Sequence, residues 1–218
     1  MDPEYTVKSP AQLQKIVTTL TELYPGARYE LNFSTPLELL VATILAAQCT
    51  DERVNAVTKD LFQKYRSARD YVKVEQEELE KDVHPTGFYR KKASAIRAAC
   101  QYLLDKHNGE VPRTMAEMVK IPGVARKTAS VILGNAFGVV EGFIVDTHVE
   151  RLARRFGWSQ QRDAVKIEQD LMRFVPREEW LNLAHCMILH GRNVCTAKKP
   201  ACARCPLTVC CPSAFTES

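Results

Sequence analysis

Residues 121–129 read IPGVARKTA, and this stretch decides the fold expected for the chain. Pro122 cannot continue a preceding helix, and Gly123 accepts a backbone geometry that a Cβ atom would resist. The stretch therefore predicts two helices joined by a tight hairpin, the second running from about Ala125 to Phe137. Backbone amides at such a turn, and at the free N-terminus of the second helix, form a site that suits a phosphate.

The hairpin lies in one of three windows that contain no Asp or Glu, residues 83–104, 118–140 and 181–216. The windows hold eleven positive side chains, although the net charge of the whole chain is only +4. These side chains are Arg90, Lys91, Lys92, Arg97, Lys120, Arg126, Lys127, Arg192, Lys198, Lys199 and Arg204. Because each neutralised phosphate releases counterions, this segregation favours a nucleic-acid partner over a basic helix face that arose by chance.

The composition is typical of a globular protein with a sizeable core, since 45% of the 218 residues are hydrophobic. The apolar runs are short and broken by charge, which argues against a membrane span or a membrane partner. Residues 1–5 include no basic region followed by an apolar stretch, so no secretory signal is expected. We therefore expect a soluble cytoplasmic monomer in which the eight cysteines are not paired in disulfides.

The whole chain reads as helices, and an all-α fold is predicted. Thr35 and Glu38 form a capping box with Pro36 at the first helical position, and the apolar run that follows predicts a central core helix. A second capping box is predicted at residues 114–117. Further helices are expected over 9–24, 51–65, 70–82, 90–107, 147–156, 161–175 and 179–190, with 70–82 a single solvated acidic helix and Gly157 and Gly191 as C-caps.

Four cysteines near the C-terminus are spaced to enclose one centre. They are Cys195, Cys202, Cys205 and Cys211, with gaps of six, two and five residues. Four thiolates can hold either a structural zinc ion or a four-iron cluster. The spacing by itself leaves these two groups about equally favoured.

Three motifs in the chain resemble those of the endonuclease III family of DNA glycosylases. Residues 121–129 resemble its helix-hairpin-helix signature, and the VDTHV of residues 145–149 resembles its catalytic aspartate segment. The cysteine spacing resembles its iron–sulfur loop, which implies a [4Fe-4S] cluster on these four residues with Cys210 as the spare cysteine. One departure is Ala125, where the family most often has a second glycine.

The resemblance implies two helical domains with a DNA-binding cleft between them. A six-helix module with the hairpin would span residues 30–140. Residues 1–29 would join 141–218 in the iron–sulfur domain. Lys127 and Asp146 would then face each other across the boundary.

The resemblance also implies roles for individual residues. Lys127 would supply an amine that attacks C1′ of the damaged nucleotide, and Asp146 would assist its deprotonation and stabilise charge on the sugar. Asp146 could equally be only the N-cap of its helix. Two residues would fill the gap left by the extruded base, namely Gln48 and Phe88, with Tyr89 a neighbouring candidate for the role of Phe88. The other residues expected to contact DNA are Gly123, Val124, Ala125 and Arg126 of the hairpin, His148, and Lys198 and Lys199 of the cysteine loop.

The function that the resemblance implies is that of a bifunctional DNA glycosylase and abasic-site lyase of base excision repair. It would act on oxidised pyrimidines in double-stranded DNA, and on abasic sites. One alternative is a mismatch-specific thymine or uracil glycosylase on the same scaffold. An adenine-mispair enzyme is less favoured because that branch generally lacks the signature lysine. A different class is a non-catalytic, zinc-containing DNA-binding module.

Overall fold

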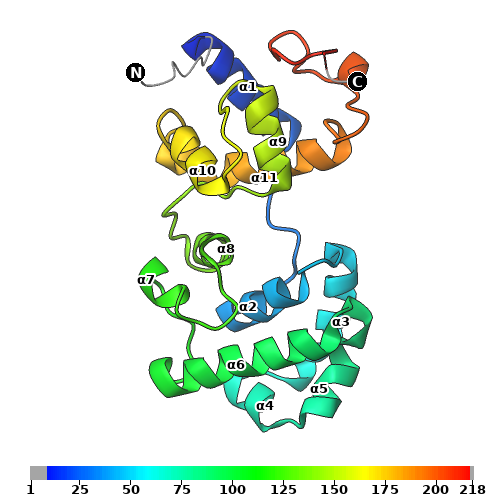
Figure 1. The fold of residues 1–218 in the computed structure, drawn as a ribbon, viewed down its shortest axis with the longest axis vertical. Coiled ribbons are helices and arrows are strands. Elements are labelled where there is room, and N and C mark those ends of the chain that lie inside the picture. Colours follow the sequence, from blue (N-terminus) through cyan, green and yellow to red (C-terminus); the bar gives the residue numbers. More distant parts are fainter. Residues whose placement is uncertain (1–8, 217–218) are drawn as a thin grey trace. The chain divides into compact units, whose positions relative to one another are not determined.

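The computed structural model describes residues 9–216, which contain helices and no strand (Figure 1). The prediction of an all-α fold is confirmed. Within the described range the chain divides into two compact units, one formed by Tyr29–Glu141 and the other by the residues before and after that segment. The N-terminal residues on which the absence of a signal was predicted lie outside the described range. No helix within that range is long and apolar enough to cross a membrane.

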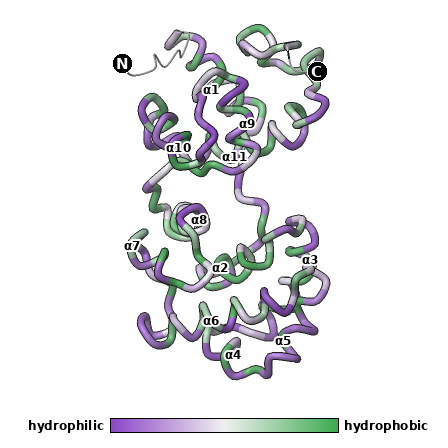
Figure 2. Tube along the Cα trace, in the orientation of Figure 1, coloured by the Kyte–Doolittle hydropathy of each residue, from purple (hydrophilic) through white to green (hydrophobic). Residues whose placement is uncertain are grey.

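The unit formed by Tyr29–Glu141 contains the hairpin and the helices that pack around it. Its elements are α2 (Pro36–Leu45), α3 (Asp51–Lys64), α4 (Ala68–Lys73), α5 (Gln76–Val83), η1 (His84–Thr86), α6 (Tyr89–His107), α7 (Met115–Met118) and α8 (Arg126–Phe137). The helix α2 contacts α3, α6 and α8, and green predominates along it in Figure 2. It is the central core helix that the sequence predicts.

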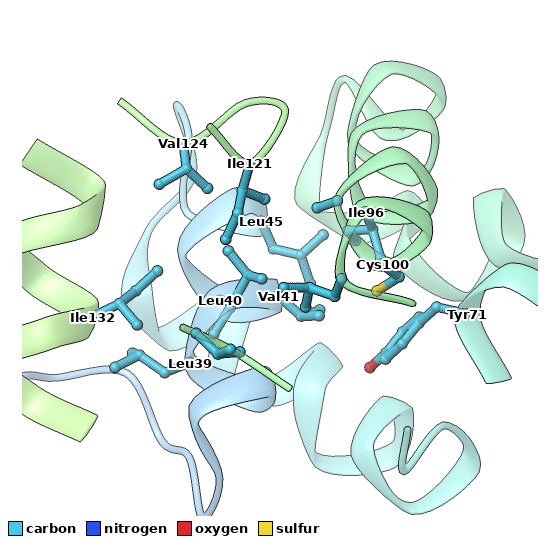
Figure 3. Packing of buried hydrophobic residues seen from close by; sticks show 14 of the residues in the cluster. Leu39, Leu40, Val41, Leu45, Tyr71, Ile96, Cys100, Ile121, Val124 and Ile132 are labelled. Atoms are coloured by element: carbon cyan, nitrogen blue, oxygen red, sulfur yellow. The ribbon is translucent and has the colours of Figure 1, made fainter. Parts of the chain in front are cut away.

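The N-terminus of α2 is held by the predicted capping box. The backbone amide of Glu38 donates to the Thr35 hydroxyl, and the Glu38 carboxylate accepts from the Thr35 amide. This reciprocal pair satisfies amides that have no partner within the helix. From there the α2 side chains Leu39, Leu40 and Leu45 run into the core, fully buried (Figure 3).

The acidic segment 70–82 differs from the single solvated helix predicted for it. It forms two short helices, α4 and α5, which both pack on α6. The backbone is extended between them at Val74, whose carbonyl accepts from the Arg97 guanidinium on α6. Each of the two short helices buries an apolar side chain, Tyr71 at 1% exposure and Leu79 at 0%, so the segment is not solvated all round.

The second unit contains α1 (Pro10–Leu23), α9 (Thr147–Arg155), α10 (Ala164–Met172), η2 (Arg177–Glu179), α11 (Trp180–Asn193) and η3 (Cys202–Arg204). The helix α11 packs against both α1 and α9. Gly157 follows the end of α9 with φ 71°, as expected of a C-terminal glycine. The C-cap predicted at Gly191 is wrong, because α11 continues through it to Asn193.

Candidate active site

The hairpin is anchored by its apolar side chains and presents its backbone to solvent. Ile121 and Val124 are buried, and Figure 3 shows them on the same side of the cluster as Leu45 of α2. The Val124 amide donates to the Ile121 carbonyl at 3.0 Å, which closes the turn. Gly123 has φ 81°, and a Cβ there would meet nothing within 4 Å. The glycine is therefore required by its backbone conformation and not by lack of space.

The N-terminus of α8 is open. Its N-cap Ala125 offers no side-chain hydrogen bond, and the amides of Gly123 and Ala125 have no hydrogen-bond partner among the described residues. Ala125 itself has φ −81°, which any residue adopts, and its methyl group is exposed. The departure from the family's second glycine therefore causes no backbone strain. The hairpin therefore offers the unpaired backbone donors at a helix N-terminus that an anion site requires.

Lys127 lies in the first turn of α8 and is exposed, as is its neighbour Arg126. Within its own unit, the Lys127 ammonium forms no ion pair or hydrogen bond with any described residue. No acidic residue lies in this first turn. The amine is therefore held beside the open helix terminus and is accessible to a ligand bound there.

Two other predicted DNA contacts, Gln48 and Phe88, project from the same unit. Gln48 is exposed in the turn after α2, and Phe88 is 62% exposed immediately before α6. Tyr89, the neighbouring aromatic residue, is half-buried against the core instead. Because the ring of Phe88 projects into solvent and that of Tyr89 packs on the core, Phe88 rather than Tyr89 is available to enter a DNA duplex.

One of the eleven positive side chains does not face the solvent. Lys92 is only 4% exposed, and its ammonium donates to two backbone carbonyls of the same unit. The acid-free window 83–104 therefore contributes fewer surface cations than its sequence suggests. The sequence pattern could not predict that Lys92 is buried and Lys91 exposed, because adjacent basic residues of a helix differ only in the face they occupy.

Asp146 occupies the N-cap of α9 in the other unit. Its Oδ1 accepts from the amides of His148 and Val149, both at 2.8 Å. Its second carboxylate oxygen has no hydrogen-bond partner among the described residues. The capping role therefore uses one oxygen and leaves the other available for a second function.

His148 is positioned by side chains that sequence reasoning missed. Its Nδ1 lies 3.0 Å from Nη2 of Arg151, and the same guanidinium donates to the carbonyls of Gly191 and Cys195 at 2.9 and 3.1 Å. Arg155, one turn further along α9, is also bound to the cysteine loop. The i, i+4 spacing of Arg151 and Arg155 could have indicated this arrangement, since it places both arginines on one helix face.

Gly191 is required by close packing of α11 on α9. A Cβ at this position would lie 2.9 Å from the Cβ of His148 and 3.0 Å from Nη2 of Arg151. We expect Gly191→Ala to displace both side chains and to lower the free energy of unfolding by about 1–3 kcal/mol, measured by denaturant titration. Ser94→Ala, at an exposed position of α6, is the control and is expected to change stability little. Equal stability of Gly191→Ala and the wild type would show that the two helices separate at no cost.

The four predicted cysteines line one pocket. Cys195, Cys202, Cys205 and Cys211 all contribute to it, while Cys210 does not. The side chain of Gln12 instead donates to the Cys210 carbonyl at 2.6 Å. Cys211, the residue that the resemblance favours, therefore lines the pocket, and its neighbour Cys210 does not.

Two cationic or polar side chains approach the cysteine sulfurs. Nη1 of Arg155 donates to Sγ of Cys195 at 3.1 Å, and Nε2 of His190 lies 3.5 Å from Sγ of Cys205. Burial raises the pKa of the Cys211 thiol to about 11 and also raises the pKa of Cys205. In the described residues no three His, Cys, Asp or Glu side chains converge on one metal ion. The four thiols that line the pocket nevertheless suit a thiolate-ligated group, which would displace their protons on binding.

Comparison with known proteins identifies the family of the chain. Residues 41–177 match the model of the HhH-GPD superfamily of base excision DNA repair proteins. This chain belongs to the HhH-GPD superfamily. Among its HhH-GPD relatives, endonuclease III of Synechocystis sp. is 50% identical over 200 residues, covering 92% of this chain and 91% of the relative. Endonuclease III of Bacillus subtilis is 46% identical, covering 92% and 91%.

Two solved structures are similar to the chain over almost its whole length. One is a non-covalent endonuclease III–DNA complex, with a TM-score of 0.90 and 45% identity, covering 95% of this chain and 97% of that one. The other is a trapped endonuclease III–DNA covalent intermediate, also with a TM-score of 0.90 and 45% identity, covering 95% and 98%. The resemblance drawn from the three motifs is confirmed.

Proposed function

We propose that this protein is a bifunctional DNA glycosylase and abasic-site lyase that removes oxidised pyrimidines from double-stranded DNA. The observation that carries the proposal is the exposed Lys127 amine, without an ion pair in its unit, beside unpaired amides at the start of α8. An amine is the nucleophile that links base removal to strand cleavage, because water would leave no imine to promote elimination. We propose that the protein acts as a monomer in the cytoplasm, where it is associated with DNA.

The proposed reaction begins with attack by Nζ of Lys127 on C1′ of the damaged nucleotide. The N–C1′ bond forms as the bond from C1′ to the base breaks, and the base leaves with its electron pair and takes up a proton. Opening of the sugar ring then gives an iminium between Lys127 and C1′. Loss of a proton from C2′ expels the 3′ phosphate and breaks the strand, and water finally hydrolyses the imine and frees the enzyme.

Asp146 is assigned a role in this sequence through its free carboxylate oxygen. That oxygen would accept the proton that the Lys127 amine loses and stabilise positive charge on the sugar as the base departs. Since Oδ1 caps α9, the carboxylate is held in one orientation while it acts. His148, fixed by Arg151, would contact the DNA backbone near the extruded nucleotide.

Extrusion of a base leaves a gap that must be filled. We assign this role to Gln48, whose amide can hydrogen-bond to the unpaired base, and to Phe88, whose ring can enter the stack as an apolar wedge. The hairpin residues Gly123 to Arg126 would bind the backbone phosphate. The open amides of Gly123 and Ala125 and the positive charge of Arg126 suit that ligand.

Cys195, Cys202, Cys205 and Cys211 would hold a [4Fe-4S] cluster. When bound, the cluster supplies a rigid cross-link between four thiolates, and no step of the proposed reaction passes through it. The loop between the first two cysteines carries Lys198 and Lys199, both exposed, which would contact DNA phosphates. Arg155 supports the loop by donating to the Thr196 carbonyl at 2.9 Å.

Duplexes that each carry one defined lesion test the proposed function. We expect the purified protein to cleave DNA containing thymine glycol, dihydrouracil or an abasic site, and to form a covalent complex with each when borohydride is present. Activity confined to uracil or thymine opposite guanine would instead support the mismatch-specific alternative. Tight binding without cleavage or a trapped complex would support the non-catalytic module.

A further inference from the structure

The Gln48 and Phe88 loops share an unusual backbone feature. Gln48 has φ 54° and Phe88 has φ 47°, in the left-handed region that non-glycine residues rarely adopt. Only Asn108 and Phe215 are like them among the non-glycine residues that the structure describes. Such conformations persist only where the surroundings hold them, and they concentrate at functional sites.

One buried side chain connects the two loops. Nζ of Lys92 donates to the Leu45 carbonyl at 2.8 Å and to the Thr86 carbonyl at 2.7 Å. Leu45 ends α2, three residues before Gln48, and Thr86 ends η1, two residues before Phe88. The Lys92 ammonium therefore connects the segment that carries Gln48 to the segment that carries Phe88.

This bridge carries a buried charge that no carboxylate neutralises. Lys92 forms no ion pair with a described residue, and burial lowers its pKa, an effect that the nearby Cys49 thiol partly opposes. An apolar side chain would fill the same space without the desolvation penalty of an ammonium. The lysine therefore supplies something that packing alone does not, namely a fixed distance between two helix-terminal carbonyls.

We propose that Lys92 is a positioning residue that holds the Gln48 and Phe88 loops at a fixed spacing, so that both side chains enter the DNA duplex together. The inference rests on the proposed function, because it gives the two loops a shared task in base extrusion. Lys92 does not touch the DNA or the reacting atoms. Its effect is confined to substrates in which a base must leave an intact duplex and both strands must be supported.

A pair of substrates separates this role from a general effect on stability. Thymine glycol in a duplex requires extrusion, whereas an abasic site in single-stranded DNA leaves no duplex gap to fill. We expect Lys92→Met to slow base removal from the duplex by about tenfold or more, while borohydride trapping on the single strand stays within about twofold of the wild type. Lys106→Met is the matched control, because Lys106 is exposed on the same helix, and we expect it to change neither reaction.

A fluorescent base gives a second readout, which a mere change in the stability of the protein would not alter. With 2-aminopurine opposite the lesion, we expect wild-type protein to raise the fluorescence on binding and Lys92→Met to give a smaller rise at saturating protein. If Lys92→Met does not fold, Lys92→Gln, which can still donate to one carbonyl, serves in its place with the same expectation. Equal losses on both substrates, or no loss on either, would overturn the inference.

The same experiment distinguishes failure of this inference from failure of the proposed function. Wild-type protein that forms no trapped complex on either substrate would overturn the proposed function, whatever the Lys92 variants do. Wild-type protein that traps and cleaves normally, with a Lys92→Met variant indistinguishable from it, would overturn the positioning role alone.

Discussion

Replacing Lys127 by Gln is expected to abolish strand cleavage and borohydride trapping on abasic and thymine glycol duplexes. The amide of Gln is not nucleophilic at neutral pH, so neither the bond to C1′ nor the imine that promotes elimination can form. The side chain is exposed and makes no ion pair within its unit, so the substitution leaves no buried group without a partner. We therefore expect the melting temperature to change little, which thermal unfolding of the same samples would show.

Lys120→Gln is the matched control for this experiment. Lys120 is exposed, lies in the same acid-free window and precedes the hairpin, so its loss removes the same charge without removing the proposed nucleophile. We expect Lys120→Gln to lower DNA affinity modestly, with the difference from the wild type shrinking as salt is added. Trapping at saturating protein is expected to be unchanged. Undiminished trapping in Lys127→Gln would contradict the assignment of the nucleophile.

Substitution of Cys211 is the second change with a large expected effect. We expect the Cys211→Ser protein to lose most of its iron and the broad absorbance of an iron–sulfur cluster at about 400 nm. A cluster held by only three thiolates has one iron without a protein thiolate and is lost more readily. Cys210→Ser is the matched control, since Cys210 is adjacent in sequence but does not line the pocket. It is expected to keep the wild-type spectrum and iron content.

Two results would contradict the assignment of the cysteines. Equal loss of absorbance in the two variants would show that the pocket does not distinguish Cys210 from Cys211. Purified wild-type protein with stoichiometric zinc and no visible absorbance would replace the cluster with a structural zinc ion.

Local signals in the sequence predicted most of the helices. The capping box at Thr35 and the Pro-Gly turn at residues 122–123 act through hydrogen bonds and backbone geometry within a few residues, so they can be read without knowing the fold. The DNA-contacting roles expected of Gln48, after α2, and of Phe88, before α6, came only from the family resemblance. The left-handed backbone at both positions has no signature in either residue type.

The features that the sequence did not reveal depend on contacts between distant segments. Lys92 is one of three consecutive basic residues, and its burial is decided by the carbonyls of Leu45 and Thr86. Gly191 reads as a helix terminator but serves to let α9 approach α11. The break of the acidic segment at Val74 is likewise decided by α6, through Arg97.

The most direct test of the proposed mechanism is to identify the amino acid that becomes bonded to DNA. The wild-type protein would be trapped with borohydride on an abasic duplex, digested with protease and nuclease, and the modified peptide sequenced by mass spectrometry. The proposed mechanism requires the added sugar mass on Nζ of Lys127. A sugar adduct on any other residue, with Lys127 recovered unmodified, would contradict it.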